Sequence, residues 1–534
     1  MSSPERRHRG LALAMLAGLA VLPVILPAFR IIDGLRGSSP ASDFALLELS
    51  TSQALHGEQL LGPYSRFGWR HPGPAYFYLL APFYAASGAS SASLPVAALV
   101  LNWAAVLGMV ACLRRWSDTA AVPLFALGLA LFYGLYLGPG FLYNVWNPAV
   151  TILPFGLFLM LCAGLACGRT VVLPIIAGVG SFLIQTHLGY LPCVMTAVLT
   201  SGWFWFRRRR FPDDAVTAAR MPLVLTVGTL ALLWIMPVDE QLTRDPGNLT
   251  LILRFFMRGA DGQAWGEAVT TVAREIAWPW SYSLFGSIGW YAPYQPIVGW
   301  RLAVCTAFAL AQVGLLVVWA MRLRDRPFFR ALACICLACT IVAVPATMRV
   351  SGEIRPYLTA WISMIGVVGS CAAIGPLLPY PSLPSQHWAR AMGREQAALI
   401  LAVGLAIAVA MVGRPLVRDS QFPPARTISD AVKTELSKSG IQRPHVAIQT
   451  RSPELFFAAS AVLLQLHKAG MGFSVDRPWW NFFGEKWHPV GVEDGLIDFR
   501  IRPSAGMPTP LMCVPNGASE VCVSVGQRPA TTTR

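Results

Sequence analysis

The chain has 534 residues, of which 55% are hydrophobic and 13% are charged. Soluble domains carry about 25% charged residues, so this composition excludes an ordinary water-soluble enzyme. The formal net charge of +15 would indicate a nucleic-acid partner in a soluble protein, but basic residues of membrane proteins gather in the loops that set orientation. We therefore expect membrane lipid as a partner and no nucleic acid.

Apolar blocks long enough to cross a bilayer, which takes about 20 helical residues, recur along the chain. The first, 11–29, follows Arg6, Arg7 and Arg9 and is typical of an uncleaved signal anchor. Ten more blocks follow, at 94–113, 120–138, 148–167, 171–186, 190–206, 221–237, 300–321, 331–348, 357–379 and 397–413. The segment 74–88 is short and bounded by Pro74 and Gly88, which predicts a re-entrant half-helix. The predicted fold is an α-helical multi-pass membrane protein with about 11 transmembrane helices plus re-entrant or juxtamembrane helices.

Orientation follows from the arginines. Alternating the eleven spans satisfies the positive-inside rule at every turn. It places on the side of the amino terminus the arginine clusters at 114–115, 169, 207–220, 322–330 and 390–394. The protein is then expected in the cytoplasmic (inner) membrane, with its carboxyl end outside the cytoplasm. We predict a membrane module at 1–413, whose first outer loop is 31–93, and an extracytoplasmic domain at 414–534.

The carboxy-terminal domain is expected to be a small α/β domain. Strand-like segments at 445–450 and 472–476 flank a helical segment at 453–469 that ends before Gly470, which predicts a βαβ unit. Segments 497–501 and 521–525 add strands, and Cys513 and Cys522 form a disulfide or stay as two buried thiols. The aromatic residues at 479–487 indicate a core or a membrane-interface belt, with a sugar-stacking platform as the alternative.

The first outer loop carries the strongest candidate for a catalytic group. We expect Ser42 to cap a helix that starts at Asp43 and stops near Gly57, so that Asp43 lies in the first helical turn. Asp43 is either a catalytic carboxylate or simply a helix-start carboxylate that the helix dipole favours. Glu48 points to another face of the same helix, where we expect it to be solvated or ion-paired, so the two do not form an obvious metal pair.

A loop rich in Gly and Pro follows at 62–74, and its fixed backbone can aim aromatic and cationic side chains. Arginine suits phosphate because its planar group donates two parallel hydrogen bonds, and aromatic faces suit sugar rings. The alternative is a basic loop that contacts lipid headgroups. The candidate donor-binding residues of this loop are Tyr64, Arg66, Trp69, Arg70 and His71.

Three further outer turns contribute polar residues at the same membrane level. They supply Asn147, His187 and Arg355 as candidates for donor binding. Taken singly, His187 is also consistent with a packed helix end, and Arg355 with a pair to Glu353. The long outer segment 238–299 is expected to hold amphipathic helices.

These features together resemble the GT-C glycosyltransferases, in particular bacterial members of the protein-mannosyltransferase and aminoarabinose-transferase type. The resemblance rests on the amino-terminal anchor, on Ser42-Asp43, and on the stretch Arg70-His71-Pro72-Gly73-Pro74-Ala75-Tyr76-Phe77-Tyr78. It implies that Asp43 is the catalytic base. Relatives often carry a second acidic residue where this chain has Phe44, and another where it has Asn147. Both departures argue against a metal requirement. A divalent metal is a possible cofactor, and we assign it no ligands.

The resemblance implies a transferase that moves a hexosyl or pentosyl group, with inversion, from a polyprenyl-phosphate sugar donor to an envelope glycan, lipid or protein acceptor. The alternatives are a lipid-linked glycan polymerase or ligase, a lipid-linked sugar transporter or flippase, and a non-catalytic envelope scaffold. The transporter is disfavoured because spans such as 94–113 and 397–413 contain no ionisable residue that would mark a path across the bilayer.

Overall fold

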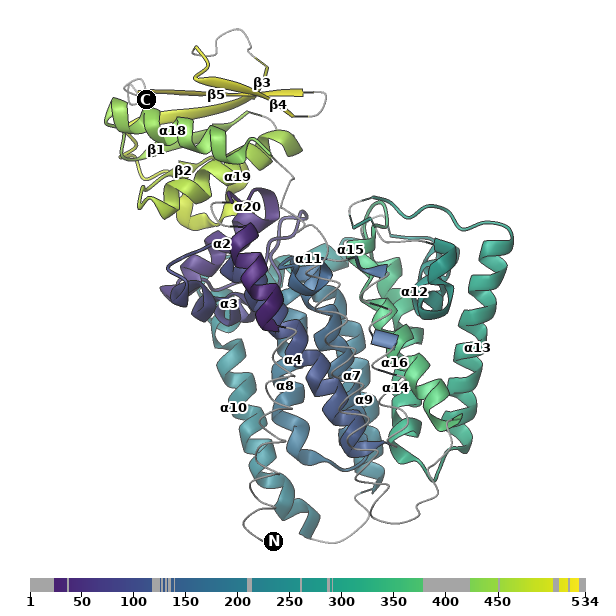
Figure 1. Ribbon diagram of the computed structural model, residues 1–534. Helices are drawn as coiled ribbons and strands as arrows, with labels where there is room; N and C mark the ends of the chain where they lie inside the picture. The colour runs from purple at the N-terminus through teal and green to yellow at the C-terminus, as the bar shows by residue number, and fades with distance from the viewer. Residues whose placement is uncertain are drawn as a thin grey trace, which may run out of the picture. The chain divides into compact units, whose positions relative to one another are not determined.

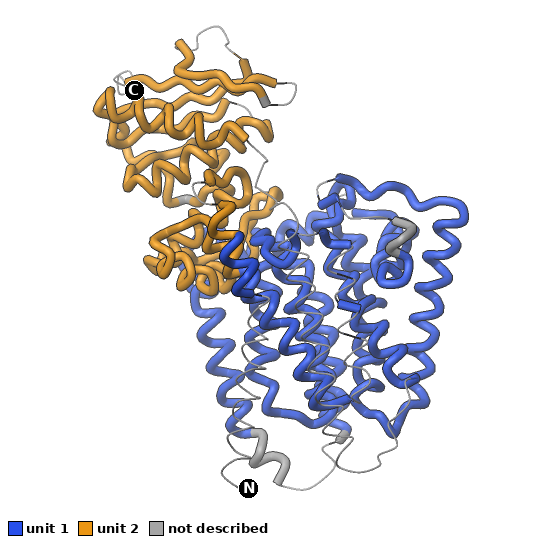
Figure 2. The backbone as a smooth tube through the Cα atoms, viewed as in Figure 1, with its two compact units in different colours: residues 1–30, 98–415 blue, residues 31–97, 416–534 orange. Residues whose placement is uncertain are grey.

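A computed structural model of the chain describes residues 24–35, 38–117, 141–208, 214–259, 262–285, 289–290, 292–377, 423–449, 452–502, 509–516 and 519–527, with scattered residues between 118 and 140. The chain forms two compact units (Figure 2). Unit 1 comprises Met1–Arg30 and Ala98–Pro415, and unit 2 comprises Ile31–Ala97 and Leu416–Arg534. The predicted boundary after residue 413 lies outside the described residues and stays a prediction.

Unit 1 is helical, and its long helices run side by side (Figure 1). Its principal helices are α4 (Ser93–Trp116), whose first turns belong to unit 2, α6 (Asn147–Val150), α7 (Ile152–Ala166), α8 (Leu173–Thr186), α9 (Leu191–Arg208), α10 (Asp214–Thr243), α11 (Asn248–Met257), α12 (Trp265–Phe285), α13 (Trp300–Arg322), α14 (Pro327–Met348), α15 (Pro356–Thr359) and α16 (Ile362–Ile374). The predicted blocks that fall mainly on described residues all coincide with helices. The blocks 11–29, 120–138 and 397–413 lie wholly or mostly outside the described residues.

Five of the described helices are long and apolar enough to cross a membrane. They are Ser93–Trp116, Asn147–Ala166, Arg220–Thr243, Trp300–Arg322 and Pro327–Met348. Helix α10 exposes large apolar side chains, including Leu225 (53%), Val227 (66%) and Leu232 (75%). An apolar surface of this extent is costly in water and is typical of a helix that faces lipid. The structure therefore fits a multi-pass membrane protein, while the number of eleven spans stays a prediction.

Helices α12 and α16 approach each other closely at a glycine. A Cβ atom added to Gly366 would lie 2.5 Å from the Ile276 carbonyl oxygen and 2.8 Å from its Cα atom. These are backbone atoms, so the helices would have to move apart.

Gly366→Ala is therefore expected to destabilise unit 1 by about 1–3 kcal/mol, the usual cost of overpacking. The control is Gly314→Ala on the exposed side of α13, where an added Cβ meets nothing within 4 Å. Thermal unfolding of the two purified variants in detergent checks the prediction. Equal melting temperatures for the two variants would contradict it.

Unit 2 contains a five-stranded sheet of order β2-β1-β3-β5-β4. Its strands are β1 (Pro444–Ile448), β2 (Ser474–Val475), β3 (Gly495–Ile501), β4 (Met512–Asn516) and β5 (Ser519–Gln527). Strand β1 pairs in parallel with β2 and with β3, and β5 pairs antiparallel with β3 and β4. The predicted βαβ unit is confirmed, because α19 (Pro453–Lys468) connects β1 to β2 and ends before Gly470, whose φ is 74°. Helix α18 (Ala425–Ser439) and strand β4 were not predicted.

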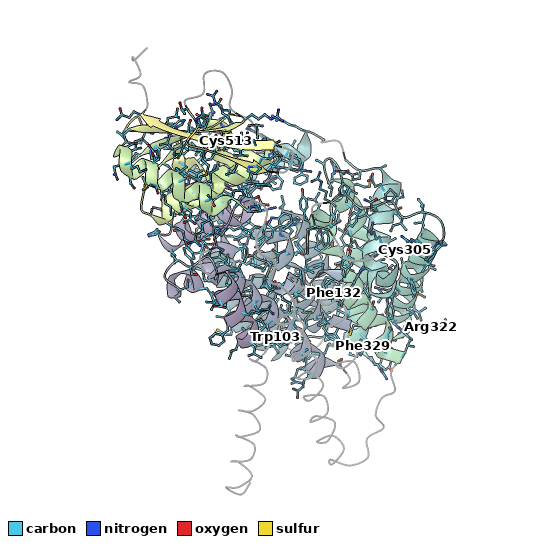
Figure 3. The ribbon with its side chains drawn as sticks, turned by 45° about the horizontal axis from the view of Figure 1, so that its top comes forward. Trp103, Phe132, Cys305, Arg322, Phe329 and Cys513 are labelled. Atoms are coloured by element: carbon cyan, nitrogen blue, oxygen red, sulfur yellow. A yellow bond between two sulfur atoms is a disulfide. The ribbon has the colours of Figure 1, made fainter. Side chains whose placement is uncertain are left out.

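Cys513 and Cys522 lie opposite each other on β4 and β5 and are joined by a disulfide. Cys513 is labelled on the sheet in Figure 3. The structure thus selects the disulfide from the two states that the sequence left open.

Two helices from the amino-terminal part of the chain complete unit 2. Helix α2 (Ser42–Leu55) places Ala45, Leu46 and Leu49 in the same hydrophobic core as α19 and the sheet. Helix α3 (Ala75–Ala86) packs on α2 and has 12 residues, which is short for a membrane crossing, as predicted for 74–88. The segment predicted as the first outer loop therefore folds together with the carboxy-terminal domain.

Candidate functional site

Asp43 lies in the first turn of α2 and is half-buried. The Tyr64 hydroxyl donates a short hydrogen bond to its Oδ1 atom. A bond from a neutral donor favours the ionised carboxylate and fixes its orientation. The structure thus brings together two of the residues that the sequence singled out.

The start of α2 is held by the carboxy-terminal domain. Ser42 has a φ of 55°, in the left-handed region that non-glycine residues rarely adopt. Its backbone N–H donates to the Oγ atom of Ser460 on α19 at 2.7 Å. The predicted cap is wrong, because no side chain caps α2. The N–H that needs a partner is satisfied by a residue far along the chain.

The loop 62–74 folds back on itself through backbone hydrogen bonds. Tyr64 and Arg70 form an antiparallel bridge, and the turn contains Gly68 at a φ of 85°, which favours glycine. Arg66 is exposed near the tip, with its guanidinium 4.9 Å from the centre of the Phe67 ring. By contrast, Trp69 and His71 are 7% and 8% exposed, and their rings meet edge to face. Of the two arginines of this loop, Arg66 is the more exposed.

Arg70 is engaged by backbone groups of the carboxy-terminal domain. Its Nε and Nη2 atoms donate to the carbonyl oxygens of Asn481 and Phe482, at 3.3 and 2.8 Å. In return, the Asn481 side chain donates to the Ser65 carbonyl at 2.7 Å. These three bonds fasten the loop to α20 (Trp480–Phe483).

The aromatic residues at 479–487 belong largely to the core of unit 2. Trp479, Phe483 and Trp487 are 4%, 3% and 7% exposed, and Trp480 and Phe482 pack against them. The core interpretation is therefore confirmed for this cluster.

Glu48 is buried, with 1% exposure, rather than solvated. Its Oε1 atom is 2.5 Å from Lys468 Nζ and accepts hydrogen bonds from Tyr84 and Ser91, each at 3.0 Å. Of the two expected states, the ion pair is correct, and it joins α2 to α19.

The other three predicted residues lie in unit 1, where the three outer turns meet. Asn147 Nδ2 donates to the Thr186 carbonyl at 3.1 Å, which joins the first turn to that of His187. Trp146 contacts Tyr357, with ring centres 5.0 Å apart, which brings in the third turn. These two contacts bring the three turns together within unit 1.

The two titratable residues of these turns differ in their surroundings. His187 is buried, and burial lowers its pKa to about 4, so the imidazole is neutral at neutral pH. Arg355 lies at the surface and pairs with Glu353 at 3.3 Å. Exposed ion pairs of this kind are weak.

Sequence reasoning missed a fully buried carboxylate, Glu275 on α12. The Tyr136 hydroxyl donates to both of its oxygens at 3.2 Å, and Tyr294 donates to Oε1. Burial raises the pKa of Glu275 to about 7, although these hydrogen bonds oppose the rise. The available signal was an acidic residue directly before the apolar run Ile276-Ala277-Trp278.

The described side chains include a cluster of potential metal ligands. The cluster of three potential ligands among them is Cys513, Glu520 and Cys522. Its two sulfur atoms form the disulfide, so they are not thiolate ligands. This cluster therefore does not fit a metal site.

No family model and no curated protein matches the sequence. Among solved structures, the crystal structure of ArnT from Cupriavidus metallidurans bound to undecaprenyl phosphate is similar, with a TM-score of 0.51 and 14% identity over 98% of each chain. The apo-state structure of the same protein, with 14% identity, covers 97% of this chain and 98% of its own at a TM-score of 0.44. The chain therefore has the fold of this ArnT structure, which agrees at the level of the fold with the resemblance noted in the sequence.

Proposed function

We propose that this protein is an inverting GT-C glycosyltransferase that moves a sugar from a polyprenyl-phosphate donor to a cell-envelope acceptor. The observation that carries the proposal is the fold similarity, over 98% of both chains, to a protein crystallised with undecaprenyl phosphate. The proposal is also supported by the Asp43 carboxylate, which a hydrogen bond from Tyr64 orients and which could act as a general base.

In the proposed reaction, Asp43 accepts the proton of the acceptor hydroxyl while the oxygen of that hydroxyl attacks the anomeric carbon of the donor sugar. The bond between that carbon and the phosphate oxygen breaks, and the polyprenyl phosphate leaves with the electron pair. Arg66 is the proposed cation for the leaving phosphate within unit 2, since Arg70 donates to backbone carbonyls there. Asn147, His187 and Arg355 are proposed to bind the donor within unit 1, with neutral His187 acting as a hydrogen-bond donor or acceptor.

The proposed location of unit 2 is the outer face of the cytoplasmic membrane. Because α2 and the carboxy-terminal sheet share one core, they must lie on the same side of a membrane. The ten spans proposed between them are an even number, which meets this condition. The disulfide between Cys513 and Cys522 favours an oxidising compartment.

The proposed location is tested by fusing to the carboxyl end a reporter enzyme that is active only outside the cytoplasm. The fused reporter is expected to be active. An inactive but expressed fusion would refute this location.

The proposed activity is tested by incubating membranes that contain the protein with a panel of labelled undecaprenyl-phosphate sugars, including mannose, glucose and aminoarabinose. Transfer from at least one monophosphate donor to the envelope fraction is expected, and control membranes without the protein should show none. Transfer only from diphosphate-linked donors would favour the polymerase or ligase alternative instead.

A further inference from the structure

We infer that the carboxy-terminal domain is a working part of the catalytic centre, in which Ser460 and Phe482 are positioning residues for Asp43. This inference rests on the proposed function, because it requires Asp43 to be the base. It gives the domain a role in the catalytic step. That role does not follow from the fold similarity or from the disulfide.

The first line of evidence is the hydrogen bond from Ser460 to the backbone beside Asp43. The Ser460 side chain is fully buried and accepts the Ser42 N–H at 2.7 Å. Its hydroxyl donates in turn to the Phe457 carbonyl at 3.0 Å, so its orientation is fixed. The residue that it holds, Ser42, has the unfavourable φ of 55°. A strained conformation persists only where its surroundings enforce it, and here the enforcing atom belongs to α19.

The second line of evidence is the packing of Tyr64, the residue that bonds the carboxylate. Its ring lies 4.9 Å from that of Phe482 and 6.4 Å from that of Phe456, measured between ring centres. Both phenylalanines belong to the carboxy-terminal domain. Because packed aromatic side chains have restricted rotamers, they determine where the Tyr64 hydroxyl points.

The third line of evidence is the attachment of the backbone on either side of Tyr64. Arg70, its bridge partner, is bonded to the carbonyls of Asn481 and Phe482, and Asn481 is bonded to the Ser65 carbonyl. The loop and α20 are thus joined by bonds in both directions. Displacement of α20 would move Tyr64 and, through it, the carboxylate of Asp43.

Positioning of this kind affects the rate more than donor binding. A general base acts only in the correct geometry, and a misplacement of about 1 Å can cost about 10²-fold in rate. Tyr64 and Ser460 themselves need not touch the substrate.

The test compares Ser460→Ala with Ser52→Ala in the full-length protein, using the undecaprenyl-phosphate sugar that gives transfer in the donor panel. Both variants remove a hydroxyl that bonds α2 to α19, since Ser52 Oγ lies 2.8 Å from His467 Nε2. Only Ser460 bonds the residue next to Asp43. We expect Ser460→Ala to lower kcat by about 10-fold or more with little change in KM, and Ser52→Ala to keep the wild-type kcat.

Tyr64→Phe provides a second readout, which does not depend on how Ser460→Ala folds. A carboxylate that loses a donated hydrogen bond holds its proton more tightly. The rate of a reaction that needs the ionised base then declines at a higher pH than in the wild type, so the acidic limb of the pH profile should shift upward. A role that is only structural would lower the rate at every pH without this shift.

The two proposals fail in different ways. If the wild type transfers no sugar from any donor, the proposed function and this inference are both refuted. If the wild type is active and Asp43→Asn is inactive, but Ser460→Ala and Ser52→Ala have equal kcat values and Tyr64→Phe shows no pH shift, only this inference is refuted.

Discussion

Asp43→Asn is expected to abolish measurable sugar transfer while leaving the protein folded and inserted in the membrane. The amide has nearly the shape of the carboxylate, and its oxygen can still accept the hydrogen bond from Tyr64. It cannot accept the proton of an acceptor hydroxyl. Loss of a general base typically lowers the rate by about 10²–10⁴-fold.

The measurement is initial transfer rate per amount of inserted protein, with the donor that is active in the panel. Asp430→Asn is the matched control, because Asp430 is an exposed carboxylate of the same unit that pairs with Lys433 on α18. The control should transfer sugar at the wild-type rate. Turnover by Asp43→Asn within tenfold of the wild type would remove Asp43 from the role of base.

Local patterns were sufficient to predict most of the regular structure. Apolar blocks predicted the long helices of unit 1, because helices in a membrane are selected by continuous hydrophobicity. Alternation at 445–450 and the glycine at 470 predicted β1 and the end of α19, because both depend on neighbours in the sequence. Strand β4 was missed since Met512–Asn516 contains a proline and shows little alternation.

The surroundings of Asp43 could not be predicted in this way. Serine is a residue type that commonly caps helices, but the backbone N–H of Ser42 donates a hydrogen bond to the Oγ atom of Ser460, which is 418 positions away in the chain. Asp43 and Tyr64 were both singled out, yet their contact depends on how the loop 62–74 folds against α20. Glu275 was not predicted because its burial depends on residues that are distant in sequence. Tyr136 and Tyr294, which donate hydrogen bonds to it, are brought beside it only by the tertiary structure. The residues were recognisable, whereas their partners were set by tertiary structure.

Lys468→Met is expected to destabilise unit 2, because it breaks the buried ion pair that joins α19 to α2. It would leave the Glu48 carboxylate buried without its cation, although Tyr84 and Ser91 would still donate to it. Removing one partner of a buried ion pair costs about 3–5 kcal/mol. Lys468 retains 22% exposure, so we expect about 3 kcal/mol, the lower end of this range.

Lys486→Met is the control for Lys468→Met, because Lys486 pairs with Glu58 in the same unit but both side chains are about half exposed. Such a pair contributes about 0–1 kcal/mol. Denaturant unfolding of the purified variants should therefore separate the two, and equal losses would contradict the buried pair. The double variant Glu48→Gln with Lys468→Met should recover much of the stability, since glutamine still accepts bonds from Tyr84 and Ser91 and carries no charge. Recovery of stability would show that the cost of Lys468→Met arises from the buried Glu48 carboxylate that is left without its cation.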